Sequence, residues 1–367
     1  MPRYAQPDRW LFLTTLALCA IGIVMVFSAS AVMAREEYGS GYAFVLRQIV
    51  ALALGLAGMF ALMRTDYRKL RQPGVIYTGV CVVVVLLIAV FFLDKNASTH
   101  RWIRFGPVGF QPSELAKLAM IAYLAWFLEV RRRPYSFGMN DLTHTILPAL
   151  GPVVVIAGLI VMQPDMGTGF QIFLIALAML FVAGMSFRYV AYAALAALPA
   201  VYLLIVRVPY RYERVLAFLH PESDPQGRGF QLLQSLIAVG SGGFTGVGLM
   251  ESRQKLFYLP EAHTDFIYAV LCEEMGFIGG IILLALFVVY GWRGVRAALA
   301  APDDFGKFLA LGVTAMVVGQ ALINLSVVLG LMPTKGIPLP FVSYGGSSLV
   351  VMLLATGVLL NVSQHAE

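Results

Sequence analysis

Residues 74–93 read GVIYTGVCVVVVLLIAVFFL, an apolar stretch that contains no charged side chain. A transmembrane helix needs about 20 apolar residues to cross the hydrocarbon core of a bilayer, whereas a membrane-spanning β-strand needs about 10 residues of alternating polarity. Because this stretch is long and continuous, it predicts a transmembrane helix.

Similar apolar runs recur along the whole chain of 367 residues. The ten predicted spans are 11–33, 44–63, 74–93, 113–130, 143–163, 168–184, 188–206, 265–290, 308–331 and 341–362. The sequence therefore predicts an all-α integral membrane protein. It predicts one transmembrane domain over residues 1–367, with a long loop at about 207–264 between the seventh and eighth spans.

Composition supports this fold class. Hydrophobic residues make up 59% of the chain and charged residues 13%, while soluble domains carry about 25% charged residues. These values exclude a soluble globular domain, a disordered chain, a coiled coil and a nucleic-acid-binding protein. The three cysteines, Cys19, Cys81 and Cys272, lie far apart in apolar runs and predict neither a disulfide framework nor a metal cluster. No phosphate-binding loop of the Walker type is present, which disfavours an ATP-driven pump.

The first apolar run resembles a signal peptide in part, because basic residues precede it and Val32-Met33-Ala34 is an acceptable cleavage sequence. The run is longer than the roughly 7–15 apolar residues of a signal-peptide core. We therefore expect an uncleaved first helix.

Lys and Arg are distributed unevenly between the two sets of short loops. Ten spans place both termini on one side, and if that side is the cytoplasm, its segments contain Arg3, Arg9, Arg64, Arg68, Lys69, Arg71, Arg131, Arg132, Arg133, Arg188, Arg293, Arg296 and Lys307. The opposite short loops contain only Arg35, Lys95, Arg101, Arg104 and Lys335. This asymmetry predicts cytoplasmic termini and a long loop outside. The long loop is left out of the comparison because long loops cross largely regardless of charge, and including its basic residues would nearly cancel the asymmetry.

The start of the fourth span combines an acid and a base in the sequence RWIRFGPVGFQPSELAK, residues 101–117. Glu114 and Lys117 lie three residues apart and therefore on one helix face, and Ser113 is the predicted N-cap. Ionisable residues inside a membrane are costly, which suggests a function. The pair either joins two helices or lines a cavity for a charged headgroup. Arg101 belongs either to an ordinary interfacial loop or to a phosphate site.

A second acid, Asp165, lies in the motif QPDMGTG between the fifth and sixth spans. Ordinary turn chemistry explains the motif if Thr168 caps the next helix. A functional carboxylate at the outer surface is the alternative.

The long loop contains an amphipathic segment at 229–248, GFQLLQSLIAVGSGGFTGVG. Gln231, Gln234 and Ser235 share one stripe of a helix too short to span a membrane, which predicts a short helix at the interface.

The stretch SRQKLFYLPEAHTD, residues 252–265, brings titratable groups to the entrance of the eighth span. They are Arg253, Lys255, Glu261, His263 and Asp265. An acid at a helix start suits the positive end of the helix dipole, so capping by Thr264 or Asp265 is one interpretation. The other is that Asp265 is a general base, with Arg253 and Lys255 facing a phosphate. Glu273 and Glu274 follow as a polar lining or as contacts between helices.

Lys335 lies in the last outer loop, which reads MPTKGIPLPFVSYGGSSL over 332–349. Its small residues allow close helix packing or a helix start that binds an anion. All of these features lie on the outer side of the predicted topology. They predict an outward-facing cavity with acids, bases and phosphate-type donors.

The motifs RWIRFGPVGFQPSELAK, QPDMGTG, SRQKLFYLPEAHTDFI and GIPLPFVSYGGSSL resemble the SEDS family of bacterial envelope proteins, named for shape, elongation, division and sporulation. The resemblance covers nearly the whole chain, and the stretch from Ser252 to Asp265 is most similar to the FtsW branch, rather than to RodA. It implies ten spans and a peptidoglycan glycosyltransferase in the bacterial cytoplasmic membrane, with its active site outside. The implied substrate is lipid II, whose sugar 4-hydroxyl attacks a growing glycan that is still attached to its diphosphate lipid.

The resemblance also assigns roles to residues. It implies that Asp265 is the essential carboxylate and that Glu114, Lys117 and Asp165 are functionally sensitive. The candidates for substrate binding are Glu114, Lys117, Asp165, Arg101, Arg253, Lys255, His263 and Lys335. The resemblance implies a divalent cation, Mg²⁺ or Mn²⁺, whose ligands the sequence does not identify, and no organic cofactor. The implied partners are a class B penicillin-binding protein and, for an FtsW-like protein, divisome proteins.

Two other functions remain open at this point. A lipid II flippase would also need a polar cavity in a helical bundle, although it needs access from both leaflets, whereas the charges here cluster on one side. A scaffold that only recruits a transpeptidase would need no catalytic carboxylate. A RodA-type polymerase for elongation is the alternative within the same family.

Overall fold

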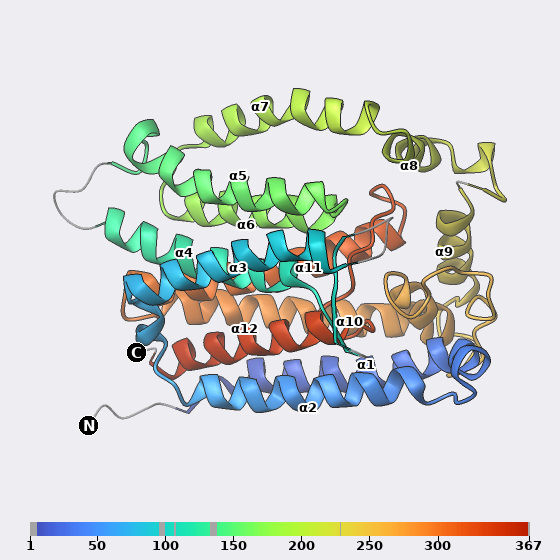
Figure 1. The fold of residues 1–367 in the computed structure, drawn as a ribbon. Coiled ribbons are helices and arrows are strands. Elements are labelled where there is room, and N and C mark those ends of the chain that lie inside the picture. The colour runs from blue at the N-terminus through green and yellow to red at the C-terminus, as the bar shows by residue number, and fades with distance from the viewer. Residues whose placement is uncertain (1–5, 95–99, 106–107, 133–137, 228, 366–367) are drawn as a thin grey trace.

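The structure is a computed structural model that describes residues 6–94, 100–105, 108–132, 138–227 and 229–365. Its long helices run back and forth along one direction and form an elongated bundle (Figure 1). Arg3, Lys95 and Arg133, which entered the predicted charge asymmetry, lie outside the described residues.

In chain order the elements are α1 (Arg9–Tyr38), α2 (Ala43–Met63), η1 (Tyr67–Arg71), α3 (Pro73–Leu93), β1 (Ile103–Phe105), β2 (Val108–Phe110), α4 (Pro112–Arg131), η2 (Leu142–Ile146), α5 (Leu147–Met162), α6 (Met166–Val182), α7 (Phe187–Val206), α8 (Pro209–Leu219), η3 (Pro221–Ser223), α9 (Phe230–Ser241), α10 (Ile267–Leu299), α11 (Asp304–Val328) and α12 (Gly346–Gln364). Strands β1 and β2 form an antiparallel hairpin with Ile103 opposite Phe110.

Each predicted span coincides with a helix, namely α1 to α7 and α10 to α12. Within the described residues, seven helices are long and apolar enough to cross a membrane. They are α1, α2, α3, the helix Leu142–Met162 that joins η2 to α5, α10, α11 and α12. The predicted helical architecture is therefore confirmed, while the count of ten crossings stays a prediction. The last helix begins at Gly346, later than the predicted 341, because Phe341 has a left-handed backbone with φ +64° that no regular helix accommodates.

The core is centred on α11 and α12, whose side chains are mostly buried. Helix α12 packs against α2 at very short range, since a Cβ atom on Gly357 would lie 2.7 Å from the Met59 carbonyl oxygen. Small residues allow such close approach of helices in a membrane, where dispersion contacts take the place of the hydrophobic effect.

The two ends of the bundle differ. The terminal end holds both chain termini (Figure 1), where the Asp8 amide donates to Ser363 Oγ at 3.2 Å. The opposite end, called the loop end here, contains loops 242–266 and 329–345, the hairpin β1–β2 and the amphipathic helix α9. Both termini therefore lie at one end of the bundle, and their shared side of the membrane stays a prediction.

Helix α10 is broken at Gly276, whose backbone has φ +66° and ψ −166°. The Gly-rich segment after α9 fills the break, with the Val247 amide donating to Glu273 O at 3.0 Å and the Phe277 amide donating to Gly243 O at 2.9 Å. These bonds replace those that the helix loses at the break, so loop 242–266 is attached firmly to α10.

Candidate functional site

Asp265 lies at the end of loop 242–266, two residues before α10 begins. A methyl group at Gly336 would lie 3.0 Å from Asp265 Oδ2, so the carboxylate stands directly against the loop that precedes α12. Within the part of the chain that the structure describes, the Asp265 carboxylate accepts no hydrogen bond. A half-buried carboxylate with both oxygens unpaired is available to accept a proton or to contact a ligand.

The pKa of Asp265 is raised to about 7, and burial is the largest cause. The neighbouring Glu261 carboxylate contributes to this rise, while the guanidinium groups of Arg214 and Arg101 oppose it. A carboxyl group with such a pKa is partly ionised at neutral pH, which suits a general base.

Asp165 lies close enough to Asp265 to influence its pKa. It is the N-cap of α6, and its Oδ1 accepts from the Thr168 amide at 3.1 Å. Its Oδ2 accepts from Gln111 Nε2 at 3.1 Å. Arg101 holds the same turn by donating to Gln163 O at 3.1 Å and to Pro164 O. The motif QPDMGTG thus forms a capped turn whose acid and neighbouring guanidinium both face the Asp265 region.

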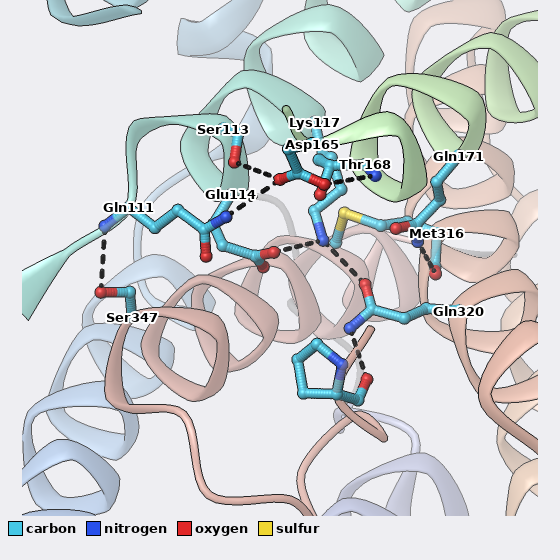
Figure 2. Close-up of polar contacts among 11 residues, drawn as sticks. Gln111, Ser113, Glu114, Lys117, Asp165, Thr168, Gln171, Met316, Gln320 and Ser347 are labelled. Atoms are coloured by element: carbon cyan, nitrogen blue, oxygen red, sulfur yellow. Dashed lines mark hydrogen bonds and ion pairs between the residues drawn. The ribbon is translucent and has the colours of Figure 1, made fainter. Parts of the chain in front are cut away.

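Glu114 and Lys117 form a buried ion pair inside α4 (Figure 2), with Lys117 Nζ 2.9 Å from Glu114 Oε1. Lys117 Nζ also donates to Gln320 Oε1 on α11 at 2.7 Å. The Lys117 side chain is only 1% exposed, so its ammonium group is enclosed by protein here. The pair joins two helices, and a contact with substrate stays a prediction.

Lys335 lies above the ring of Phe170, with Nζ 4.9 Å from the ring centroid. Burial lowers its pKa and the Asp165 carboxylate raises it in part. Lys335 therefore belongs to the same group as Asp165, Asp265 and Arg101.

Lys255 points away from this group. Its Nζ donates to Glu274 Oε1 at 2.8 Å, Ser28 Oγ at 3.1 Å and Met250 O at 2.6 Å. This buried ion pair ties loop 242–266 to α10 and α1. The predicted phosphate contact of Lys255 stays a prediction, which would require the pair to open.

His263 packs between aromatic rings, with its ring centroid 4.9 Å from that of Phe44 and 5.7 Å from that of Tyr344. Burial lowers the pKa of His263, which favours the neutral imidazole. The neighbouring Arg253 is exposed, and its backbone amide donates to Glu273 Oε1 at 3.0 Å. The structure therefore gathers Asp265, Asp165, Arg101 and Lys335. His263, Arg253 and Lys255 make other contacts, with aromatic rings, Glu273 and Glu274 respectively.

Three predicted caps are wrong. Thr168 is not the N-cap of α6, because Asp165 takes that position and accepts from the Thr168 amide. Ser113 is not the N-cap of α4, because Pro112 is already helical and Gln111 precedes it. Neither Thr264 nor Asp265 caps α10, whose first helical residue is Ile267. Capping therefore does not account for the acid at position 265.

Three residues of this region were not singled out in the sequence. Arg214 lies on α8, and its guanidinium lowers the pKa of Asp265. It also donates to Thr334 O at 3.4 Å. Gln320 and Asn324 lie one turn apart on α11 and bond to loop 329–345. Two amides four residues apart in the apolar run 308–331 were the available signal.

The predicted divalent cation has no ready site in the chain alone. Among the residues described, no three side chains of His, Cys, Asp or Glu gather as a ligand set. Mg²⁺ is often held by one or two carboxylates together with substrate phosphates, so the cation requirement stays a proposal.

Comparison with known sequences places the chain among characterised relatives. A family model described as cell cycle protein, built on FtsW, RodA and SpoVE, matches residues 9–367. Stage V sporulation protein E of Bacillus subtilis (strain 168) is 46% identical over 365 residues, which cover 99% of this chain and 98% of that protein. A probable peptidoglycan glycosyltransferase FtsW of Geobacter metallireducens is 43% identical over 361 residues, covering 98% and 95%.

Solved structures of similar proteins support the same family assignment. A structure described as showing structural coordination of polymerization and crosslinking by a peptidoglycan synthase complex matches with a TM-score of 0.78 and 34% identity, over 97% of each chain. The crystal structure of the rod shape determining protein RodA of Thermus thermophilus matches with a TM-score of 0.71 and 30% identity, over 99% of this chain and 98% of that one. These matches confirm both the predicted membrane fold and the predicted resemblance.

Proposed function

The chain belongs to the family of FtsW, RodA and SpoVE, and from this premise we propose that it polymerises lipid II with Asp265 as the general base. Relatives along its full length are named peptidoglycan glycosyltransferases, and the chain is an enzyme of this class in the bacterial inner membrane. The observation that carries the assignment to Asp265 is its unpaired carboxylate, with a pKa near 7, beside Arg101 and Arg214.

The proposed step is a displacement at the anomeric carbon of the growing glycan. The 4-hydroxyl oxygen of an incoming lipid II forms a bond to that carbon while the bond from the carbon to the diphosphate oxygen breaks. The hydroxyl proton moves to the Asp265 carboxylate, and the diphosphate leaves with the bonding electrons. A positioned base typically contributes a factor of about 10²–10⁴ to such a rate.

The leaving diphosphate accumulates negative charge, which fixed cations stabilise. Arg101 is held in place by two carbonyl oxygens of the Gln163–Pro164 turn, and its guanidinium presents further donors. Arg214 and Lys335 approach the same region from α8 and from loop 329–345. A divalent cation, Mg²⁺ or Mn²⁺, would add charge neutralisation at the phosphates when bound.

We further propose that the loop end faces outward, that both termini are cytoplasmic, and that the partner is a class B penicillin-binding protein. The described relative in a peptidoglycan synthase complex that couples polymerization to crosslinking supports such a partner. The motif from Ser252 to Asp265 favours an FtsW-like role in division with divisome partners. The identity to SpoVE leaves sporulation as an alternative, and the similarity to the RodA structure leaves elongation as another.

The test is polymerisation of lipid II by the purified protein with its penicillin-binding partner. We expect Asp265→Asn and Asp265→Ala to lower the initial rate at least about 100-fold, as for loss of a general base. Glu222→Gln is the matched control, because it neutralises an exposed acid in the same long segment between α7 and α10. A wild-type rate in Asp265→Asn would remove this carboxylate from the mechanism.

A flippase is distinguished by translocation of labelled lipid II across liposomes. We expect no translocation that depends on this protein, because the titratable cluster lies at one end of the bundle. Translocation without any polymer would favour the transporter.

A further inference from the structure

Asn324 is a buried amide in the mostly apolar second half of α11. It is 1% exposed, and its Nδ2 donates to Asp265 O at 2.7 Å and to Ile337 O at 2.8 Å. Its Oδ1 is also buried and has no hydrogen-bond partner among the described residues. One side chain thus joins the backbone of Asp265 to the loop that precedes α12.

Gln320 lies one turn earlier on the same face of α11. It is fully buried, and its Nε2 donates to Pro338 O at 2.9 Å while its Oε1 accepts from Lys117 Nζ at 2.7 Å (Figure 2). The two amides therefore hold consecutive carbonyl groups, those of Ile337 and Pro338. Through these carbonyls, α11 links the Glu114–Lys117 pair to Asp265.

This arrangement fixes the surroundings of the Asp265 carboxylate. Gly336, next to Ile337, is the residue whose missing side chain makes room for Asp265 Oδ2. Lys335 precedes Gly336, and its ammonium group lies close enough to the Asp165 carboxylate for the two charges to attract each other. A shift of the Ile337 carbonyl relative to the Asp265 carbonyl would therefore change both the space beside the carboxylate and the position of a nearby cation.

Simple helix-to-loop attachment is the competing explanation. Leucine, which has a similar shape, would avoid the cost of the unpaired Asn324 Oδ1 but would leave the carbonyl groups of Asp265 and Ile337 without this donor. Stability therefore does not separate the two explanations, whereas the pH dependence of the Asp265 carboxylate does, because attachment alone would leave it unchanged.

We infer that Asn324 is a positioning residue for Asp265, with Gln320 extending the same attachment to Lys117. This inference rests on the proposed role of Asp265. Among the described residues, the hydrogen bonds of the Asn324 side chain go to backbone carbonyl groups of the site, so its effect passes through the placement of the carboxylate.

The test compares Asn324→Leu with Asn361→Leu. Asn361 is also 1% exposed, donates to Met63 O at 2.8 Å and accepts from the Tyr67 amide at 2.9 Å, but it lies at the terminal end. Both variants lose two buried hydrogen bonds. We expect Asn324→Leu to lower kcat for lipid II polymerisation at least tenfold per folded molecule, with little change in KM and a displaced acid limb of the pH–rate profile. We expect Asn361→Leu to keep its kcat per folded molecule.

Asn324→Asp is the second variant, because it keeps the side-chain shape and removes amide donors if Asn324→Leu does not fold. An unchanged kcat per folded molecule in the Asn324 variants overturns the inference. Asp265→Asn is assayed in parallel: if it retains activity, the proposed base and this inference fail together, and if it is inactive while the Asn324 variants are not, only this inference fails.

Discussion

Neighbouring side chains shift the pKa of Asp265, and single substitutions can remove them one at a time. Its pKa is raised to about 7, chiefly by burial; Glu261 contributes to the rise and Arg214 opposes it. A general base works in its ionised form, so the rate should fall as pH decreases through this pKa. We expect Glu261→Gln to move the acid limb to lower pH and Arg214→Gln to move it to higher pH. The measurement is the initial polymerisation rate between pH 5 and 9, and shifts in the same direction for both variants would contradict the assignment.

The buried ion pair of Lys255 and Glu274 attaches loop 242–266 to α10, and substitutions of the two residues measure how much stability it contributes. Their side chains are 6% and 0% exposed, so Lys255→Met leaves the Glu274 carboxylate buried without its cation. We expect this variant to lower the free energy of unfolding by about 3–5 kcal/mol. The double variant Lys255→Met with Glu274→Leu should recover much of that loss, since no uncompensated charge remains.

Denaturation in detergent measures these losses, with Arg132→Gln as the control. Arg132 pairs with Asp304 at 3.1 Å at the surface, and exposed pairs contribute about 0–1 kcal/mol. Equal effects of Lys255→Met and Arg132→Gln would show that the buried pair does not hold the loop.

At the scale of elements, the break in α10 decides where Asp265 lies relative to the bundle. Gly276 has φ +66°, and a Cβ atom there would lie 2.3 Å from the Gly246 amide nitrogen. We expect Gly276→Ala to destabilise the fold by at least about 1–3 kcal/mol, the usual cost of an unfavourable backbone conformation, and to lower activity by displacing loop 242–266.

Gly319→Ala is the matched control for this variant. Gly319 lies within α11, and a Cβ atom there would meet no atom within 4 Å. Alanine is preferred over glycine inside a helix by about 0.5–1 kcal/mol, so this variant should be neutral or slightly more stable. A Gly276→Ala protein as stable and active as Gly319→Ala would show that the break is not required.

For the whole molecule, the apolar runs are sufficient to predict the ten long helices, because length and continuity are local properties of the sequence, whereas the short helix α8 within the predicted long loop has no such run. The residues of the site, in contrast, come from distant parts of the sequence. Asp165 and Asp265 meet although 100 positions separate them, and only the packing of α6, α10 and α11 brings them together. Lys255 and Asp265 share a short loop yet face different surroundings, because the loop turns at Phe257 and Glu261, both with positive φ. No spacing rule in the sequence predicts these two turns.

The sidedness of the bundle is the last prediction, and it bears on every proposed reaction step. Single cysteines at Ser223 and Thr65 report on opposite ends: Ser223 is exposed near α9 at the loop end, and Thr65 is exposed beside η1 at the terminal end. They are introduced after Cys19, Cys81 and Cys272 have been replaced by alanine. Because we propose that the loop end faces outward, we expect a membrane-impermeant maleimide to label Ser223→Cys in intact spheroplasts and to label Thr65→Cys only after permeabilisation. Equal labelling of both variants in detergent is the control for reactivity. Labelling of Thr65→Cys alone in intact spheroplasts would place Asp265 on the cytoplasmic side. This result would contradict the proposed polymerisation, whose product is a glycan outside the membrane.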